Sequence, residues 1–186
     1  MIKVNLSAAL LAAAVLVGCV QVPIEEPGKE TQLAISSVKD LPIEYAKGST
    51  FRISSRYLES ASVSREQLAS VYKLYEKNIS QLLQSAGYQM SLNDSADFEV
   101  VYAVALEKDL SDQTINERFG VSPGLQVSDD LEKGSFLIYI EDSESKQRVW
   151  RGAVQGFVQE DFSASERVKR TEHVVRTVMS SFFNAN

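Results

Sequence analysis

The run Phe98-Glu99-Val100-Val101-Tyr102-Ala103-Val104-Ala105-Leu106 decides the fold of this chain, because eight of its nine residues are apolar. Successive side chains of a strand point to opposite faces, and here both faces carry apolar residues. Such a strand belongs in the middle of a sheet. We therefore expect residues 98–106 to form a central strand.

Other strands are predicted on both sides of this run. Apolar and polar residues alternate over 50–57, which is typical of a half-buried strand, and a short strand is expected at 88–92. Segments 135–141 and 148–158 are close in sequence and are joined by turn-forming residues, which predicts an antiparallel hairpin. Asp142 heads the turn, where its carboxylate is expected to bond its own backbone.

Two helices are predicted, at 65–86 and 164–183. Each has apolar residues at helical spacing and a capping box at its start, with Ser64 and Gln67 in the first and Ser163 and Glu166 in the second. The order strand, helix, three or four strands, helix predicts an α+β fold for residues 49–186. We expect a two-layer sandwich, with a mainly antiparallel sheet of about four to five strands and two helices on one face.

Residues 1–18 have the features of an export signal. A short segment with one positive charge precedes an apolar run over 6–17 that is too short for a membrane-spanning helix of about 20 residues. Four residues at its end match the bacterial lipobox: Leu16, Val17, Gly18 and Cys19. The pattern predicts cleavage before Cys19 and attachment of lipid to its sulfur.

Cys19 is the only cysteine of the chain, and it stands where lipidation needs it. Two or three acyl chains, at about 0.8 kcal/mol for each buried methylene, hold a protein in a membrane almost permanently. The alternative is an ordinary secretory signal followed by a cysteine that occurs there by chance. Val20 follows in place of the aspartate that retains many lipoproteins in the inner membrane, which favours the periplasmic face of the outer membrane.

Residues 19–48 are expected to be the lipidated N-terminus and a tether. Three prolines, a glycine and mixed charges interrupt any regular period in this segment. Its later part, 33–43, has enough apolar residues to dock on the domain as an irregular strand. The tether would allow the domain to stand away from the lipid surface.

The charge balance excludes some classes of partner. The chain has 19 Lys and Arg residues against 25 Asp and Glu residues, a formal net charge of -6. Nucleic-acid binding draws on a basic face that neutralises phosphates, so no nucleic-acid partner is expected. Adhesion to anionic lipid through a polybasic patch is disfavoured for the same reason.

No catalytic residue, metal site or cofactor is predicted. His173 is the only histidine and falls off the apolar stripe of its helix, so a solvated position is expected. With Cys19 committed to lipid, neither a nucleophile-histidine arrangement nor the usual zinc ligands can be assembled. An enzyme is therefore not expected, although the many acidic residues leave an unrecognised two-carboxylate hydrolase open.

The segment 108–133 fits no predicted helix or strand. Loops of this length in compact domains are usually functional or disordered, and the sequence leaves both readings open. A binding surface is suggested by Phe119 in this segment together with Trp150 and Arg151. Trp150 and Arg151 lie on opposite sides of a predicted strand, so Trp150 should pack against a helix while Arg151 faces solvent or a carboxylate.

Several stretches resemble a family of bacterial lipoproteins that carry a domain of unknown function, of the DUF4136 type. They are Ala86-Gly87-Tyr88, the run from Ser95 to Tyr102, and above all the run from Lys133 to Asp142 leading into Val149-Trp150-Arg151-Gly152. The chain departs from the family in lacking a tryptophan in its first strand and a Phe-Pro close. The resemblance implies a fold and an address, and no activity.

The expected function is therefore that of a non-enzymatic envelope protein. Lipid on Cys19 would hold it to the membrane, and a sheet face, the long loop or a sheet edge would bind another protein or peptidoglycan. The alternative is a protein that binds a lipid or small molecule in a pocket under the 108–133 segment.

Overall fold

A computed structural model describes most of the chain after residue 31. The described ranges are 32–56, 64–93, 95–106, 108–126, 132–158 and 162–184. The predicted signal peptide, the lipobox and Cys19 lie outside the described residues, as do Tyr57 at the end of one predicted strand and 127–131 in the long segment.

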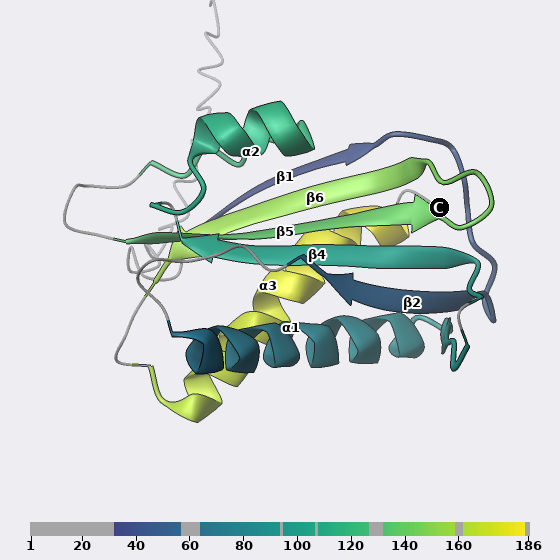
Figure 1. The fold of residues 1–186 in the computed structure, drawn as a ribbon, viewed down its shortest axis with the longest axis horizontal. Helices are drawn as coiled ribbons and strands as arrows, with labels where there is room; N and C mark the ends of the chain where they lie inside the picture. The colour runs from purple at the N-terminus through teal and green to yellow at the C-terminus, as the bar shows by residue number, and fades with distance from the viewer. Residues whose placement is uncertain are drawn as a thin grey trace, which may run out of the picture.

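The centre of the fold is a six-stranded sheet in the order β1-β6-β5-β4-β2-β3 (Figure 1). The strands are β1 (Leu33–Lys39), β2 (Thr50–Ser55), β3 (Gln89–Met90), β4 (Phe98–Leu106), β5 (Lys133–Asp142) and β6 (Arg148–Phe157). Four of them, β1, β6, β5 and β4, pair antiparallel, whereas β2 pairs parallel with both β4 and β3. The α+β class is confirmed, but the sheet is mixed and larger than predicted.

The central strand and the hairpin are confirmed. β4 lies between β5 and β2, and the pairs Val100↔Ile140 and Ile53↔Val100 fix the register on its two sides. At the hairpin turn, the Ser145 backbone N–H donates to Asp142 Oδ1 over 2.8 Å, as expected for an aspartate that heads a turn.

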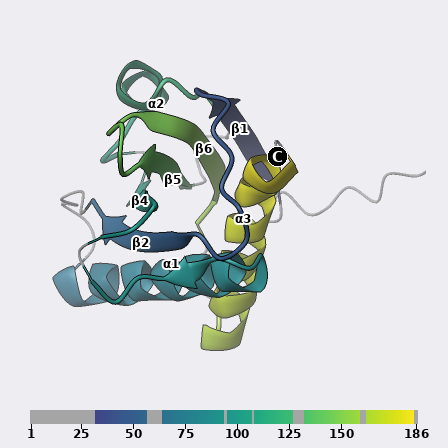
Figure 2. The same cartoon turned by 90° about the vertical axis from the view of Figure 1, so that its right-hand side faces the viewer.

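Two long helices, α1 (Arg65–Ser85) and α3 (Ala164–Asn184), cover one face of the sheet (Figure 2). Both capping boxes form: Ser64 and Gln67 bond reciprocally at the start of α1, and Ser163 and Glu166 at the start of α3. None of the helices among the described residues is long and apolar enough to cross a membrane.

Large side chains fill the space between the sheet and these helices. Phe98 on β4 is fully buried, and its ring centroid lies 4.4 Å from that of Tyr45, 6.0 Å from Phe51 and 5.3 Å from Tyr88. Gly152 on β6 allows α3 to approach, because a Cβ there would lie 2.5 Å from Val178. Bulky aromatic packing and one close glycine contact therefore hold the helices to this face.

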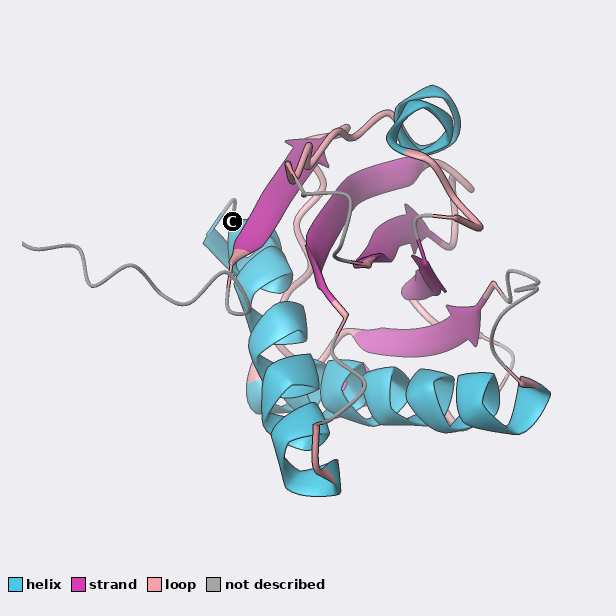
Figure 3. Ribbon diagram, turned by 90° about the vertical axis from the view of Figure 1, so that its left-hand side faces the viewer, coloured by secondary structure: helices cyan, strands magenta, loops and turns pink. Residues whose placement is uncertain are grey.

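A third helix, α2 (Asp112–Phe119), covers part of the opposite face (Figures 2 and 3). It lies inside the 108–133 segment, for which no helix was predicted. The side chains buried there are small or medium in size: Ala103, Ala105, Leu110, Ile115, Val121, Leu137 and Ala153. The predicted sandwich with two helices on one face is therefore correct for α1 and α3 but incomplete, because the described domain also has a helix on the other face.

The first strand corrects the predicted tether. β1 is a regular strand that pairs with β6 from Leu33↔Gly156 to Lys39↔Trp150. The folded domain therefore begins before the predicted boundary at residue 49, and the prolines interrupt the chain only outside this strand. Thirteen residue steps separate Cys19 from Gln32, the first residue that the structure describes.

Candidate functional site

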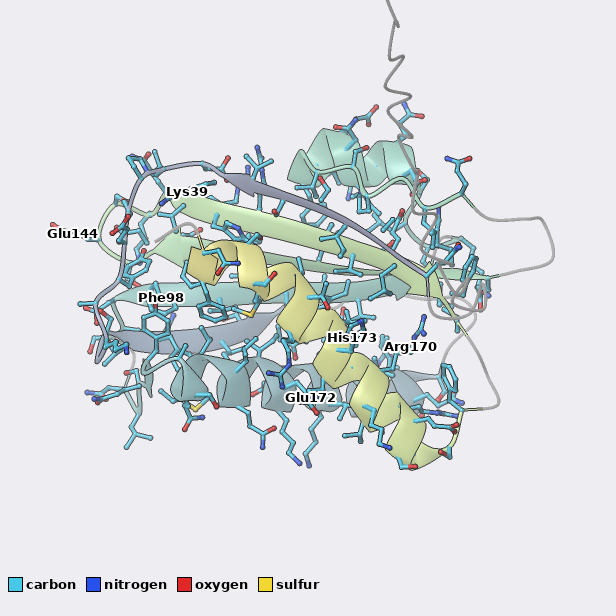
Figure 4. All side chains as sticks on the ribbon, turned by 180° about the vertical axis from the view of Figure 1, so that it is seen from behind. Lys39, Phe98, Glu144, Arg170, Glu172 and His173 are labelled. Carbon is cyan, nitrogen blue, oxygen red and sulfur yellow. The ribbon has the colours of Figure 1, made fainter. Side chains whose placement is uncertain are left out.

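The two ends of the long strands differ in what they carry. At one end, which we call the Leu33 end, the chain enters β1 beside Gly156 of β6. At the other, the turn end, lie the β5–β6 turn and the start of β4, where Phe98 pairs with Asp142. Figure 4 shows Phe98, Glu144 and Lys39 at the turn end, with Arg170 toward the opposite end on α3.

A cleft of about 480 Å³ opens at the turn end. Its walls come from the loop after β1, the segment before β4 and the β5–β6 turn: Ile43, Glu44, Tyr45, Ala46, Ser49, Ala96, Asp97, Asp142, Ser143 and Glu144. Four of these residues are carboxylates, and we call the site the acidic cleft. No basic residue is among its lining residues.

Asp142 is held in place by three hydrogen bonds. The Ser145 backbone N–H and hydroxyl both donate to Oδ1 over 2.8 Å, and the Tyr45 hydroxyl donates to Oδ2 over 3.1 Å. The bond from the Ser145 backbone does most to hold the pKa of Asp142 below its usual range, against the smaller opposing effect of burial. Asp142 is therefore ionised at neutral pH and is no candidate for a general acid.

The other fixed groups of the cleft are Asp97 and Tyr45. Asp97 Oδ2 accepts from the Thr50 backbone N–H over 2.6 Å and from the Thr50 hydroxyl over 3.0 Å. Burial, and then the negative charge of Asp142, raise the pKa of the Tyr45 hydroxyl well above its ordinary value. Tyr45 thus stays protonated and acts as a hydrogen-bond donor to Asp142.

Glu44 and Glu144 complete the acidic cleft and are exposed. Lys39 lies 3.9 Å from Glu44, a long contact that neutralises little of the charge of the cleft. Ionised carboxylates that converge on one concavity attract a cationic group. Among the described residues, no three His, Cys, Asp or Glu side chains are placed to hold a metal ion together.

The predicted binding surface of Trp150, Arg151 and Phe119 does not form one exposed patch. Trp150 is 2% exposed and packs on Phe182 of α3, with ring centroids 5.7 Å apart. The structure does bring Arg151 and Phe119 together on the α2 face. There Arg151 donates to the Phe119 carbonyl over 3.1 Å and pairs with Asp40 at 3.0 Å. Both contacts are internal, so Arg151 fastens the end of α2 to the sheet.

A buried polar network fastens the other part of the 108–126 segment. The Lys133 ammonium is 2% exposed and lies 2.9 Å from Asp112 at the start of α2. It also donates to the Leu125 carbonyl, and the fully buried Gln155 bonds both Asp112 and the Leu125 backbone N–H. Burial tends to raise the pKa of Asp112, but the hydrogen bonds from Lys133 and Gln155 outweigh it and lower that pKa.

This network bears on the predicted ligand pocket under the 108–133 segment. Ile115, Val121 and Leu125 are buried against the sheet, and the charges of Asp112 and Lys133 satisfy one another there. In the part that the structure describes, side chains therefore occupy the space that the pocket would need. The geometry favours the acidic cleft instead.

Sequence reasoning missed the residues of the acidic cleft. Tyr45 and Asp142 are 97 positions apart, and Thr50 and Asp97 are 47 apart, so no local pattern joins them. Asp142 was read correctly as a turn residue. Its role in the cleft could not be predicted, because the loop after β1 lies beside the turn only in the folded structure.

The described residues form an α+β domain with a mixed six-stranded sheet. Two long helices cover one face of this sheet, and a short helix covers part of the other. The model of one protein family, described as Domain of unknown function (DUF4136), matches residues 40–182. The chain belongs to this family, as its sequence motifs suggested. A comparison with curated proteins returned no significant match.

Solved structures with a similar arrangement share little sequence. A PDZ domain protein from Parabacteroides distasonis has a TM-score of 0.51 at 8% identity, with 81% of this chain and 36% of that chain covered. The PelC dodecamer from Paraburkholderia phytofirmans has a TM-score of 0.49 at 9% identity, with 80% of this chain and 96% of that chain covered. At such identities the likeness concerns the fold alone.

Proposed function

We propose that this protein is a lipid-anchored, non-enzymatic binding module at the periplasmic face of the outer membrane. The lipobox and Val20 support the anchor and its address. We further propose that the acidic cleft binds a cationic group, carried by another envelope protein or by peptidoglycan. The family and fold add no activity to this picture, and the fixed, ionised Asp142 suits binding rather than proton transfer.

One observation carries the proposal: the chain enters the domain at the end of the sheet opposite the acidic cleft. Gln32 precedes β1 at the Leu33 end, while the cleft lies around Asp142 at the turn end. Thirteen residue steps from Cys19 to Gln32 span at most about 45 Å when fully extended. A lipid on Cys19 would thus be attached at the Leu33 end of the domain, and the cleft lies at the end of the sheet away from that attachment.

The anchor is tested by replacing the sulfur that would carry the lipid. The Cys19→Ser variant should keep its signal peptide and should not incorporate a labelled fatty acid, whereas the unaltered protein should be processed, labelled and found with outer-membrane fractions. Equal processing and equal membrane retention of the two proteins would contradict the anchor.

The cleft is tested with two probes, a fluorescent tetralysine peptide and purified peptidoglycan sacculi. Glu44→Gln with Glu144→Gln removes two exposed charges and spares the aspartates that hold the turns. Exposed charge pairs contribute about 0.2–1 kcal/mol each, so binding should weaken roughly 2–30-fold and should weaken further with salt. The matched control, Glu66→Gln with Glu76→Gln on α1, should bind normally. Equal binding by both double variants would contradict the role of the cleft.

A further inference from the structure

Arg151 of β6 contacts two segments that lie far apart in the sequence. Its guanidinium lies 3.0 Å from the Asp40 carboxylate and donates to the Phe119 carbonyl over 3.1 Å. Asp40 begins the loop after β1, which forms one wall of the acidic cleft, and Phe119 is the last residue of α2. A single side chain therefore connects the start of the cleft wall with the end of a helix on the α2 face.

At the end of α2, Arg151 satisfies a carbonyl of the last turn. The final carbonyls of a helix have no partner within the helix, and a positive charge near them is favourable. Gly120, which follows Phe119, has a left-handed backbone with a φ of 64°. A Cβ at this position would lie 2.6 Å from Nη1 of Arg151, so a larger residue there would displace the guanidinium. The end of α2 and the position of Arg151 therefore depend on one another.

At the start of the cleft wall, two arginines share one carboxylate. Arg148 Nε lies 3.4 Å from Asp40, and among the described residues Asp40 is the only acid within ion-pair distance of Arg148 or Arg151. The side chain of Asp40 is 20% exposed and that of Arg151 19%, so water can replace only part of this interaction. The backbone N–H groups of Asp40 and Leu41 both donate to the Val149 carbonyl. These contacts hold the start of the loop beside β6.

The held position continues into the cleft. Glu44 and Tyr45 follow Asp40 by four and five residues, and both line the cleft. The loop is fastened again at Tyr45, whose hydroxyl donates to Asp142. The stretch between Asp40 and Tyr45 is thus fixed at both ends, and release of its first end would allow Glu44 to leave its place in the wall.

From these contacts we infer that Arg151 couples the last turn of α2 to the wall of the acidic cleft. In the docked state of α2, Arg151 meets both Asp40 and the Phe119 carbonyl, and in the undocked state the wall loses this hold. A cation that binds the cleft and stabilises its wall therefore favours docked α2, and by linkage docked α2 favours binding. This second step rests on the proposed function of the cleft, whereas the coupling itself rests only on the contacts of Arg151.

Hydrogen exchange of the full-length protein without ligand tests the coupling. Gly120→Ala displaces the Arg151 guanidinium from the end of α2, so the amides of 40–49 should exchange roughly threefold faster or more. Gly124→Ala is the matched control, because Gly124 also has a positive φ, of 68°, but a Cβ there meets only a backbone oxygen, at 4.0 Å. It should leave 40–49 unchanged, and both variants should leave exchange in α1 unchanged.

Arg151→Met provides a second measurement. It removes the guanidinium and keeps part of the apolar length of the side chain, so exchange should be faster in both 40–49 and 112–120. Adding Gly120→Ala should then have no further effect on 40–49, because the connecting side chain is already absent. Arg176→Met, at an exposed position of α3, should alter neither segment.

Two results without ligand would overturn the inference. The first is faster exchange in Gly120→Ala that is confined to 112–120, because the end of α2 would then move without the cleft wall. The second is an equal effect of Gly120→Ala and Gly124→Ala on 40–49, because strain in the segment, and not displacement of Arg151, would then be the cause.

The fluorescent tetralysine peptide tests the linked step. At saturation it should slow exchange in 112–120 about twofold or more in the unaltered protein and should have no such effect in Arg151→Met. Bound peptide that leaves exchange in 112–120 unchanged would overturn the linkage. If the peptide does not bind at all, the proposed function of the cleft fails, and the effects of Gly120→Ala and Gly124→Ala on 40–49 still decide the coupling.

Discussion

Different interactions attach the helices to the two faces of the sheet. On the face covered by α1 and α3, aromatic rings gather around Phe98 and the contact is almost wholly apolar. On the face covered by α2, small side chains leave room for a short helix that a buried ion pair, Asp112 with Lys133, fastens to the sheet. The first face depends on the amount of apolar surface buried, and the second on a few specific polar contacts.

This difference has a consequence for stability. Burial of large apolar side chains is non-directional and tolerates some repacking. A buried ammonium lowers the free energy of unfolding unless a charged partner is present. The stability of the α2 face therefore depends on a few individual polar contacts. Substitutions on the two faces should therefore differ in size and in their dependence on pH.

The largest effect is expected from Phe98→Ala. The variant removes the ring that Tyr45, Phe51 and Tyr88 contact, and large-to-small changes of this kind cost about 3–5 kcal/mol. Urea unfolding measures the loss. Leu92→Ala is the control, because Leu92 is 98% exposed and should change stability by less than about 0.5 kcal/mol. A loss below about 1 kcal/mol for Phe98→Ala would contradict an aromatic centre on this face.

A smaller effect, with a pH signature, is expected from Asp112→Asn. The variant removes the negative charge that lies 2.9 Å from the buried Lys133 ammonium, which should cost about 1–3 kcal/mol, since Asp112 itself is 41% exposed. Lys133→Met should cost less, because the remaining carboxylate can be hydrated.

The pH dependence of the Asp112 effect follows from the lowered pKa of this carboxyl. A group whose pKa is lower in the folded state contributes its full stability above its unfolded pKa of about 3.9 and loses it as pH falls through the folded value. The stability difference between the unaltered protein and Asp112→Asn should thus be constant from pH 5 to 7 and shrink below about pH 4. A difference that grew on acidification would show that another group dominates.

The smallest effect is expected when one methylene is removed from a buried isoleucine on each face of the sheet. Ile79 of α1 and Ile115 of α2 are both fully buried, and each Ile→Val change should cost about 0.5–1.5 kcal/mol. Global unfolding should report both losses if α2 belongs to the same cooperative unit as the long helices. If Ile115→Val instead speeds hydrogen exchange only in residues 108–126 and leaves the midpoint of global unfolding unchanged, α2 opens separately from the rest of the domain.

The sequence predicted the elements of the α1 and α3 face well and α2 on the other face poorly. Both results depend on whether an element has a periodic apolar pattern. The stripe along 65–86, the Ser64–Gln67 box and the apolar run at 98–106 are periodic signals, and each became the expected element. α2 is only eight residues long and buries Ile115 alone completely, so periodicity could not detect it. Ser111 before it and Gly120 after it were cap signals that could have marked its ends.

The residues of the candidate site were likewise predictable only where their partners are close in sequence. The turn role of Asp142 was predictable because its partner, Ser145, is three residues away. The acidic cleft needs Tyr45 and Asp97, which only tertiary structure brings to that turn. A carboxylate was one of the two partners predicted for Arg151, but the sequence did not show that it is Asp40 or that the end of α2 lies beside it. Local chemistry is therefore visible in this sequence, whereas contacts between distant segments are not.

The proposed anchor depends most on the chemical state of Cys19, and one measurement addresses that state directly. Mass spectrometry of the protein extracted from membranes should find a mature N-terminal peptide that begins at Cys19 and carries a diacylglyceryl group on its sulfur. A mature chain that begins at another residue, or an unmodified thiol at Cys19, would contradict the proposed anchor and with it the orientation of the acidic cleft.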